Sequence, residues 1–373
     1  MLKDRLIKFD LARERLDKTA GSVINSNHKK IYLDASNAIM SERLMSIYLN
    51  NCFYVSERTY NTVRCLIDYF KGMTELRYPT EQYFTKAVHA RGVDFKKMVG
   101  LDEGNSINPI CITGRSGDGK TKLLEFLYGL FHDCDRPIKN QAGKFGNFGW
   151  DSFSAEGCTS ATSIVSQTRF AQDGCSIGDY GKLCYANGVI GFGVDELQFT
   201  TKSKAANSKV TSLLLSLRSY AVPWIYACNY SLLWKLLKRN QEDVARIIPK
   251  VIHISPAGWE GEAGIEAEVA FTEKILQEID ELVPNNRDII LQKLVQLSGS
   301  SPRYLRDILS LANRIRFNKD RPKICIDCIE KAYLSTEFSV QRAQIELMNS
   351  GADYLIRKGR FDLVIPPEFD SAD

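Results

Sequence analysis

The sequence predicts an α/β fold in which a parallel sheet with covered faces is followed by a helical region. Between residues 109 and 255, short apolar runs alternate with segments of helical periodicity, the pattern expected of βα units. The first of these runs leads directly into a glycine-rich stretch, ITGRSGDGKTKLL, at residues 112–124. From residue 265 to 345 the periodicity is helical, with one interruption at residues 298–302.

The glycine-rich stretch has the spacing of a phosphate-binding P-loop, Gly114-x-x-x-x-Gly119-Lys120-Thr121. Glycines let the backbone turn tightly and present several N–H groups to one phosphate. The lysine reaches the β- and γ-phosphates, and the threonine hydroxyl binds Mg²⁺. The flanks support this interpretation, since residues 109–113 are β-prone and residues 122–131 repeat apolar side chains at helical spacing. The alternative is a surface turn that carries a lysine by chance.

We therefore expect ATP and Mg²⁺ as cofactors. The residues expected to contact the nucleotide are Gly114, Arg115, Ser116, Gly117, Asp118, Gly119, Lys120, Thr121 and Lys122, with Arg303, which opens a helix of the later helical region. Thr121 is also expected to contact the metal.

The expected site is completed by acidic residues at the end of a second strand. Residues 189–196, VIGFGVDE, read as an apolar strand that ends in Asp195 and Glu196. Asp195 is expected to hold Mg²⁺ through its water shell, and Glu196 to orient and deprotonate the attacking water. The strand at 222–228 ends at Asn229, whose amide is expected to sense the γ-phosphate or hold that water; the alternative is an ordinary asparagine in a turn.

An arginine near the last strand of the sheet is a candidate for action on a neighbouring subunit. Arg239 and Arg246 precede the strand expected at residues 250–254. Because Arg246 lies at a helix end, it is the preferred candidate for an arginine finger that reaches the neighbour's γ-phosphate. Arg239 remains the alternative, and a solvated helix face is the other explanation for both.

Composition constrains the setting of the protein. The chain has 373 residues, 44% of them hydrophobic, and a net charge of +4, so that any nucleic-acid contact must come from local patches. Ten cysteines without framework spacing and a charged start to the chain lead us to expect free thiols in the cytoplasm. Cys325 and Cys328 form a C-x-x-C, but no second pair or nearby histidine completes a zinc site, which favours two helix cysteines.

Four regions are expected. Residues 1–105 form an N-terminal helical extension for partner docking, with an amphipathic helix at 1–18 and helix at 42–72; residues 106–255 form the nucleotide-binding core. Residues 256–335 form a helical lid, and residues 336–373 a C-terminal helix and acidic tail. Strands are expected at 109–113, 189–194, 222–228 and 250–254, with one more near 148–154. No apolar run approaches the roughly 20 residues of a membrane span.

The order of these motifs resembles that of an AAA+ ATPase, and more specifically the TnsC/TniB regulators of Tns-type DNA transposition. The resemblance covers most of the chain. It rests on four segments, LNNCFYVSERTYNTVRCLIDYF, GFGVDELQFTTKSKAANSKVTSLLLSL, AVPWIYACNYSLLWKL and RFDLVIPPEFD. Two features depart from the family: Asn229 stands where threonine is frequent, and residues 137–188 form a polar insertion.

The resemblance implies an ATP-dependent homo-oligomer around double-stranded DNA, a ring or filament for which a heptamer or hexamer is expected. It would link a TnsD/TniQ-type target selector to a TnsA/TnsB-type transposase, with ATP hydrolysis controlling disassembly. Lys202, Lys204 and Lys209 follow the Asp-Glu strand in a polar loop and are the expected phosphate contacts; a solvated basic loop is the alternative. Three other functions remain: a helicase loader or other DNA-remodelling AAA+ ATPase, a STAND-type signalling NTPase, and, less favoured because of the lid, a small-molecule kinase.

Overall fold

A five-stranded parallel sheet forms the centre of the computed structural model, which describes residues 2–25, 30–82, 107–131, 138–139, 145–146, 150–154, 184, 189–198, 211–212, 214–215, 218, 223–254, 262–284 and 287–366. The strand order is β6-β7-β8-β3-β9, and all four pairings are parallel. The strands are β3 (Ile110–Thr113), β6 (Trp150–Ser154), β7 (Gly191–Asp195), β8 (Trp224–Cys228) and β9 (Val251–His253). Each lies where the sequence predicts a strand, so the α/β class and the parallel sheet are confirmed.

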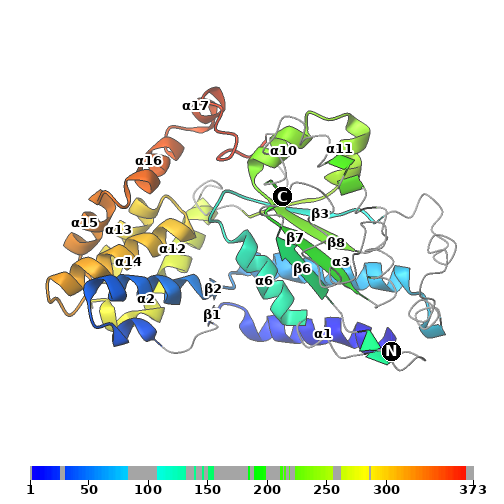
Figure 1. Ribbon diagram of the computed structural model, residues 1–373, viewed down its shortest axis with the longest axis horizontal. Helices are drawn as coiled ribbons and strands as arrows, with labels where there is room; N and C mark the ends of the chain where they lie inside the picture. The colour runs from blue at the N-terminus through cyan, green and yellow to red at the C-terminus, as the bar shows by residue number, and fades with distance from the viewer. Residues whose placement is uncertain are drawn as a thin grey trace.

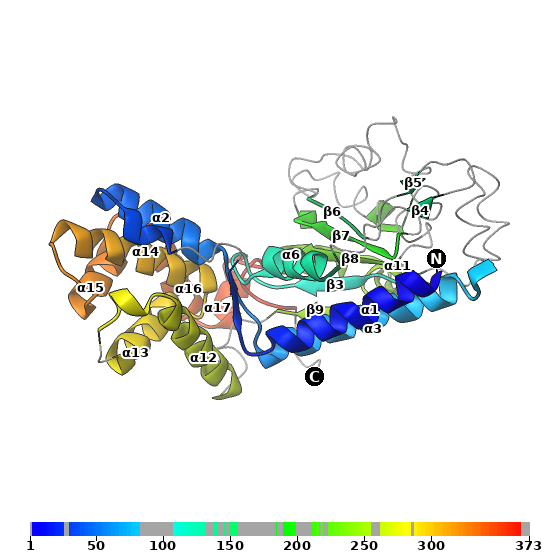
Figure 2. The same ribbon diagram turned by 90° about the horizontal axis from the view of Figure 1, so that it is seen from below.

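Helices cover both faces of this sheet, as the continuously buried strands β7 and β8 require. Helices α1 (Leu2–Thr19), α3 (Glu57–Arg77) and α6 (Lys120–Phe131) pack on one face, with Phe9, Val63 and Leu127 in the shared core. Helices α10 (Tyr230–Leu236) and α11 (Gln241–Ile247) cover the other face through Leu233 and Ile247. Figure 2 shows α1 and α3 side by side beneath the sheet.

The helical region predicted after the sheet is also confirmed, and it forms a second body beside it (Figure 1). It comprises α12 (Glu262–Glu278), η5 (Asp280–Leu282), α13 (Arg287–Ser298), α14 (Pro302–Asn318) and α15 (Ile326–Leu334), and continues into α16 (Ser339–Met348) and α17 (Ala352–Arg357). The predicted interruption falls between α13 and α14. Gly299 and Ser300 both have positive φ there, and Pro302 opens α14. We call α12–α15 the lid.

The prediction of one continuous helix at residues 42–72 is wrong. The chain instead forms α2 (Ala38–Asn50), the strand β2 (Cys52–Tyr54) and then α3. The run Cys52 to Val55 is β-prone, and β2 pairs antiparallel with β1 (Val23–Asn25). The Ser56 side chain then accepts a hydrogen bond from the Thr59 N–H and so starts α3 as its N-cap.

The N-terminal residues divide their contacts between the sheet and the lid. Whereas α1 and α3 pack on the sheet, the segment between them, η1 (Ile31–Asp34) and α2, packs on the lid core. Asn313 of α14 donates hydrogen bonds to the Ser41 carbonyl and hydroxyl at 3.2 and 2.7 Å, in a buried position. The β1–β2 ribbon therefore connects the two bodies.

The C-terminal residues also join the two bodies. After α17 the chain returns to the sheet side, where the Trp234 indole N–H of α10 donates a 2.8 Å hydrogen bond to the Val364 carbonyl. Phe361 packs against the same indole with ring centroids 5.0 Å apart.

The short strands β4 (Ile138–Lys139) and β5 (Phe145–Gly146) pair antiparallel with each other. Among the described residues, none of the helices is long and apolar enough to cross a membrane.

Candidate nucleotide-binding site

The predicted P-loop lies between β3 and α6, as its function requires. Gly117 and Gly119 have φ values of +91° and +97°, which L side chains rarely adopt. A Cβ on Gly119 would meet nothing within 4 Å, whereas a Cβ on Gly114 would lie 2.6 Å from the Ile254 carbonyl oxygen. The loop thus needs glycine at 114 for close packing against the end of β9 and at 117 and 119 for its backbone turn, and it leaves open space at 119.

Lys120 places a buried cation inside this loop. Its ammonium donates hydrogen bonds to the carbonyls of Gly114 and Arg115 at 2.9 and 2.7 Å, and the side chain is almost fully buried. Burial lowers the pKa of Lys120, and the carboxylates of Asp118, Glu196 and Asp195 act against this shift. A phosphate brought to the loop would supply the opposite charge that this desolvated ammonium favours.

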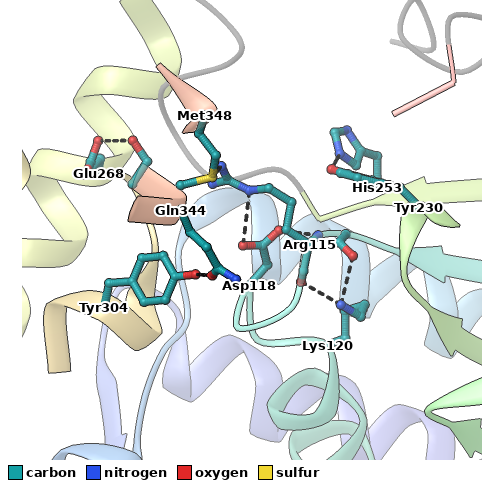
Figure 3. Close-up of polar contacts among 11 residues, drawn as sticks. Arg115, Asp118, Lys120, Tyr230, His253, Glu268, Tyr304, Gln344 and Met348 are labelled. Atoms are coloured by element: carbon teal, nitrogen blue, oxygen red, sulfur yellow. Dashed lines mark hydrogen bonds and ion pairs between the residues drawn. The ribbon is translucent and has the colours of Figure 1, made fainter. Parts of the chain in front are cut away.

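A buried acid–base pair braces the loop from within (Figure 3). The Arg115 backbone N–H donates a 2.6 Å hydrogen bond to Oδ2 of Asp118, and the two side chains form an ion pair at 3.7 Å. Burial raises the pKa of Asp118 to about 6, although Arg115 and Lys120 favour its ionised form. The Arg115 guanidinium also lies 2.6 Å from the sulfur of Met348 in α16, so the loop contacts the C-terminal helices directly.

The acidic strand end meets the P-loop. Strand β7 carries Asp195 to the carboxyl edge of the sheet, and the Thr121 hydroxyl donates a 2.6 Å hydrogen bond to its Oδ2. The structure therefore brings together the two residues expected to bind Mg²⁺, from positions 74 apart in the chain.

Glu196 and Asn229 are joined by Gln198, a residue to which the sequence patterns assign no role. Gln198 donates from its amide to the Glu196 carboxylate, and its amide oxygen accepts a 3.3 Å hydrogen bond from the Asn229 backbone N–H. Glu196 has a φ of +56°, a strained conformation for a non-glycine residue that is typical of functional sites. Asn229 is the N-cap of α10, yet its side chain makes no capping hydrogen bond. The one available signal for Gln198 was its place in the polar stretch just after Glu196.

The strand order explains why these groups meet. Because β8 lies between β7 and β3, Asn229 at the end of β8 falls between the P-loop and Glu196. The next residue, Tyr230, is hydrogen-bonded to His253 at the end of β9 (Figure 3). The carboxyl edge of the sheet thus gathers the P-loop, the acidic pair and the amide that the sequence predicts there.

A cavity of about 760 Å³ opens beside the P-loop. Asp118, Gly119 and Lys122 form its wall on the loop side, and the segments 53–62, 253–254, 266–272 and 298–306 form the rest. Its volume is that of a typical small-molecule site. The walls from β2, α3 and α12 could not be recognised in the sequence, because they are assembled from segments that no local motif connects.

Glu268 fixes the turn that forms one side of this cavity. Its carboxylate accepts hydrogen bonds from the hydroxyls of Ser298 and Ser300 at 3.2 and 2.6 Å. Burial raises the pKa of Glu268. The turn holds the start of α14 against the P-loop: a Cβ on Gly117 would lie 2.9 Å from the Arg303 Cβ. The Ser301 hydroxyl there is buried and has no hydrogen-bond partner among the described residues.

The preferred arginine candidate, Arg246, lies away from this edge of the sheet. Helix α11 ends at Ile247, just before β9 begins, so Arg246 lies toward the amino edge of the strands. It is exposed and forms an ion pair with Glu242 one helical turn earlier. Burial lowers the pKa of the Arg218 guanidinium, and the nearby charge of Arg246 lowers that pKa further. The Arg218 side chain donates a hydrogen bond to the Asn108 side-chain carbonyl, ahead of β3. Arg239 lies between α10 and α11.

The remaining predicted residues are placed as follows. Ser116 is exposed on the loop, and Lys122 forms a 2.7 Å ion pair with Glu125 on α6. Lys202, Lys204 and Lys209 lie outside the described residues, as does most of the insertion at 137–188.

The residues present fit a nucleotide and a divalent cation. Open space at Gly119, the Lys120 ammonium and the start of the 12-residue helix α6 suit a polyphosphate. A hydroxyl and a carboxylate in contact, from Thr121 and Asp195, are oxygen donors of the kind that Mg²⁺ takes. The buried Ser301 hydroxyl adds a polar group on the lid side of the same loop.

Comparisons with known proteins give distant structural likenesses. The structure is similar to the ADP form of the ORC2 protein from Aeropyrum pernix, with 15% identity, a TM-score of 0.42 and coverage of 62% of this chain. The chain spans 63% of the length of that protein. It is also similar to the RuvB Holliday junction branch migration motor of Thermotoga maritima (11% identity, TM-score 0.39, 79% of this chain and 96% of that one).

A third likeness is to the structure of Drosophila ORC bound to DNA, with 13% identity, a TM-score of 0.41 and coverage of 77% of this chain and 80% of that one. No family model matches the sequence, and no curated protein sequence matches it.

Proposed function

We propose that the protein is an ATPase of the AAA+ class. The observation that carries this proposal is the 2.6 Å hydrogen bond from Thr121 to Asp195, because it unites the P-loop with the acidic strand end that ATP hydrolysis requires. Lys120 would bind the β- and γ-phosphates, and Thr121 and Asp195 would hold Mg²⁺. The metal would neutralise charge on the phosphate oxygens.

The chain's own groups account for the remaining steps of hydrolysis. Glu196 accepts a proton from the attacking water, and Gln198 holds the Glu196 carboxylate in position. Asn229, at the end of β8, would sense the γ-phosphate or hold that water. The cavity beside Gly119 would receive the base and ribose. Arg303, which packs against Gly117 on the lid side of the loop, would contact the nucleotide. Arg246 would act on the nucleotide of a neighbouring subunit, which its place at the opposite edge of the sheet supports.

The wider role that we propose is regulation of DNA transposition, with the protein acting in the cytoplasm. Its support is the resemblance of four sequence segments to TnsC/TniB regulators. The protein would assemble on duplex DNA as a homo-oligomer, through Lys202, Lys204 and Lys209, and connect a target selector to a transposase. In this proposal residues 106–255 are the core, 256–335 the lid, and 1–105 and 336–373 the extensions that meet partners.

The experiment measures ATP binding and ATP hydrolysis with and without duplex DNA. Lys120→Ala is expected to abolish binding. Glu196→Gln is expected to bind ATP normally and to hydrolyse it about 10²- to 10⁴-fold more slowly, so that DNA-bound assemblies persist. Lys358→Ala, which removes an exposed lysine beyond α17, is the matched control and should leave both activities unchanged. Unchanged ATP affinity in Lys120→Ala would refute the nucleotide site.

Assembly on duplex DNA, followed in the same samples and with a replicative helicase or a transposase added, separates the competing functions. Nucleotide binding with no DNA-stimulated assembly would favour a STAND-type switch. DNA-stimulated assembly that responds to a replicative helicase and not to a transposase would favour a helicase loader.

A further inference from the structure

The C-x-x-C sequence at the start of α15 brings two thiols together. Cys325 is the N-cap of this nine-residue helix, and Cys328 lies one turn inside it. Their sulfur atoms are 3.3 Å apart. Cys328 is fully buried in the lid core, whereas Cys325 is partly exposed. One thiol can therefore meet a reagent from solvent, and the second lies directly behind it.

A cation contacts the partly exposed thiol of Cys325. The Arg321 guanidinium lies 2.6 Å from the Cys325 sulfur and 3.8 Å from that of Cys328. Partial burial acts to raise the pKa of Cys325, but the backbone N–H and thiol of Cys328 together with Arg321 lower it below its ordinary value. Burial raises the pKa of Cys328. This is the asymmetry of an attacking thiolate with a protected partner.

A second pair of cysteines is almost equally close together but is not accessible from solvent. Cys111 of β3 and Cys228 of β8 have sulfur atoms 3.6 Å apart, but both are fully buried in the sheet core. Burial raises the pKa of Cys111 well above its ordinary value. The distance between the sulfur atoms is nearly the same in the two pairs. The pairs differ in solvent access and in the arginine that contacts Cys325, so Cys111 and Cys228 serve as an internal control.

We propose that Cys325 and Cys328 form a thiol–disulfide exchange site that reacts with small disulfides such as glutathione disulfide. The Cys325 thiolate attacks one sulfur of glutathione disulfide, breaks its S–S bond and releases one glutathione. The Cys328 thiol then loses its proton and attacks the Cys325 sulfur, which forms the protein disulfide and releases the second glutathione. The two protein thiols are oxidised, the small disulfide is reduced, and the protons end on the two glutathione thiols.

The alternative of a metal site has no support in the part of the chain that the structure describes, where no group of three or more metal-ligating side chains occurs. The proposal does not depend on the ATPase assignment, because it rests on α15 and its surroundings alone.

The experiment incubates the reduced, folded chain in buffers of increasing glutathione disulfide to glutathione ratio, followed by acid quenching, alkylation and peptide mass spectrometry. The wild-type chain should form the Cys325–Cys328 disulfide, while Cys111 and Cys228 stay reduced. Cys328→Ser should accumulate a mixed disulfide of glutathione on Cys325, because no second thiol resolves it. Cys325→Ser should leave Cys328 reduced.

Cys65 supplies the second control. It is partly exposed and hydrogen-bonded to the Lys250 ammonium, so it tests whether a cation beside an accessible thiol is sufficient. If Cys65 acquires glutathione while Cys325 and Cys328 remain reduced, the proposal is overturned. Absence of glutathione on Cys328→Ser would overturn it as well.

The pH dependence of alkylation tests the role of the cation. The alkylation midpoint of Cys325 should move to higher pH in Arg321→Gln, which a purely structural role would not cause; an unchanged midpoint would overturn that role. The other charged groups around the pair are Asp327 and Lys331 on α15, Arg316 on α14 and Lys319 after it.

Discussion

The Thr121 hydroxyl donates a 2.6 Å hydrogen bond to Oδ2 of Asp195. Thr121 lies in the first turn of α6, and Asp195 ends a strand that is separated from the P-loop strand by β8. The contact therefore depends on the strand order and not on local sequence. It defines the point at which a divalent cation would join the two halves of the site.

Asp195→Asn should remove the effect of Mg²⁺ on nucleotide binding. Asparagine retains an oxygen that accepts from Thr121, but it lacks the negative charge that attracts the cation. We expect ATP affinity without Mg²⁺ to stay within about twofold and hydrolysis to fall by about 10² or more. Titration of ATP with and without Mg²⁺ measures this. Thr121→Ser, which keeps the hydroxyl, is the control; a full Mg²⁺ response in Asp195→Asn would be inconsistent with the metal assignment.

Gln198→Ala should slow hydrolysis without weakening ATP binding. Gln198 links the Glu196 carboxylate to the Asn229 backbone, so its loss frees the carboxylate from its position. We expect kcat to fall about tenfold or more, as for other displaced catalytic groups, with KM nearly unchanged. Steady-state kinetics distinguish the two constants. If KM rises while kcat is unchanged, Gln198 contributes to binding and not to positioning.

Asp118 should make stability depend on pH. Its folded-state pKa is raised to about 6, above its ordinary value of 3.8. The associated stability is fully present below about pH 4 and is lost as the pH rises through about 6, a change of about 3 kcal/mol in the free energy of unfolding. Denaturant unfolding of the nucleotide-free chain between pH 4 and 7 measures it.

The control for this pH effect is a pair of variants. Asp118→Asn should flatten the slope across that window, although Arg115 then loses its ion-pair partner and overall stability can fall. Asp353→Asn, at an exposed position of α17, should leave the slope as in the wild type. An equal slope in the wild type and Asp118→Asn would show that another group titrates.

Arg246→Ala should spare ATP binding but abolish hydrolysis that depends on assembly. The side chain lies toward the amino edge of the strands, away from its own P-loop, which suits a charge supplied to a neighbour. Mixing Arg246→Ala with Glu196→Gln subunits should restore ATPase activity, because the latter supply a working Arg246. If mixing restores nothing and Arg239→Ala shows the loss, the role passes to Arg239.

Local sequence was sufficient to predict the parts of the site that follow strands. The P-loop, Asp195, Glu196 and Asn229 each sit where an apolar run ends, and parallel strands bring such ends to one edge. Sequence was insufficient where contacts join distant segments. Arg115 meets Met348 across 233 residues, and nothing in either segment indicates the other.

The N-terminal region shows the same limit in a different way. Residues 42–72 have helical periodicity, yet β2 interrupts them because β1 offers it a pairing partner. The role of Gln198 could not be predicted, because it comes from bridging two strand ends, a relation that appears only after the sheet is assembled.

We propose that ATP drives assembly on duplex DNA. The measurement that tests this most directly is the affinity of the protein for two unrelated duplexes. Each affinity is measured over a range of salt concentrations, once with a non-hydrolysable ATP analogue and once with ADP. We expect tight binding with the analogue alone, nearly equal affinity for both duplexes, and a steep salt dependence. The salt slope should fall by about one unit for each phosphate-binding lysine removed in the triple variant Lys202→Ala, Lys204→Ala and Lys209→Ala. Equal affinity with ADP, or strong preference for one duplex, would rule out an ATP-dependent assembly on DNA.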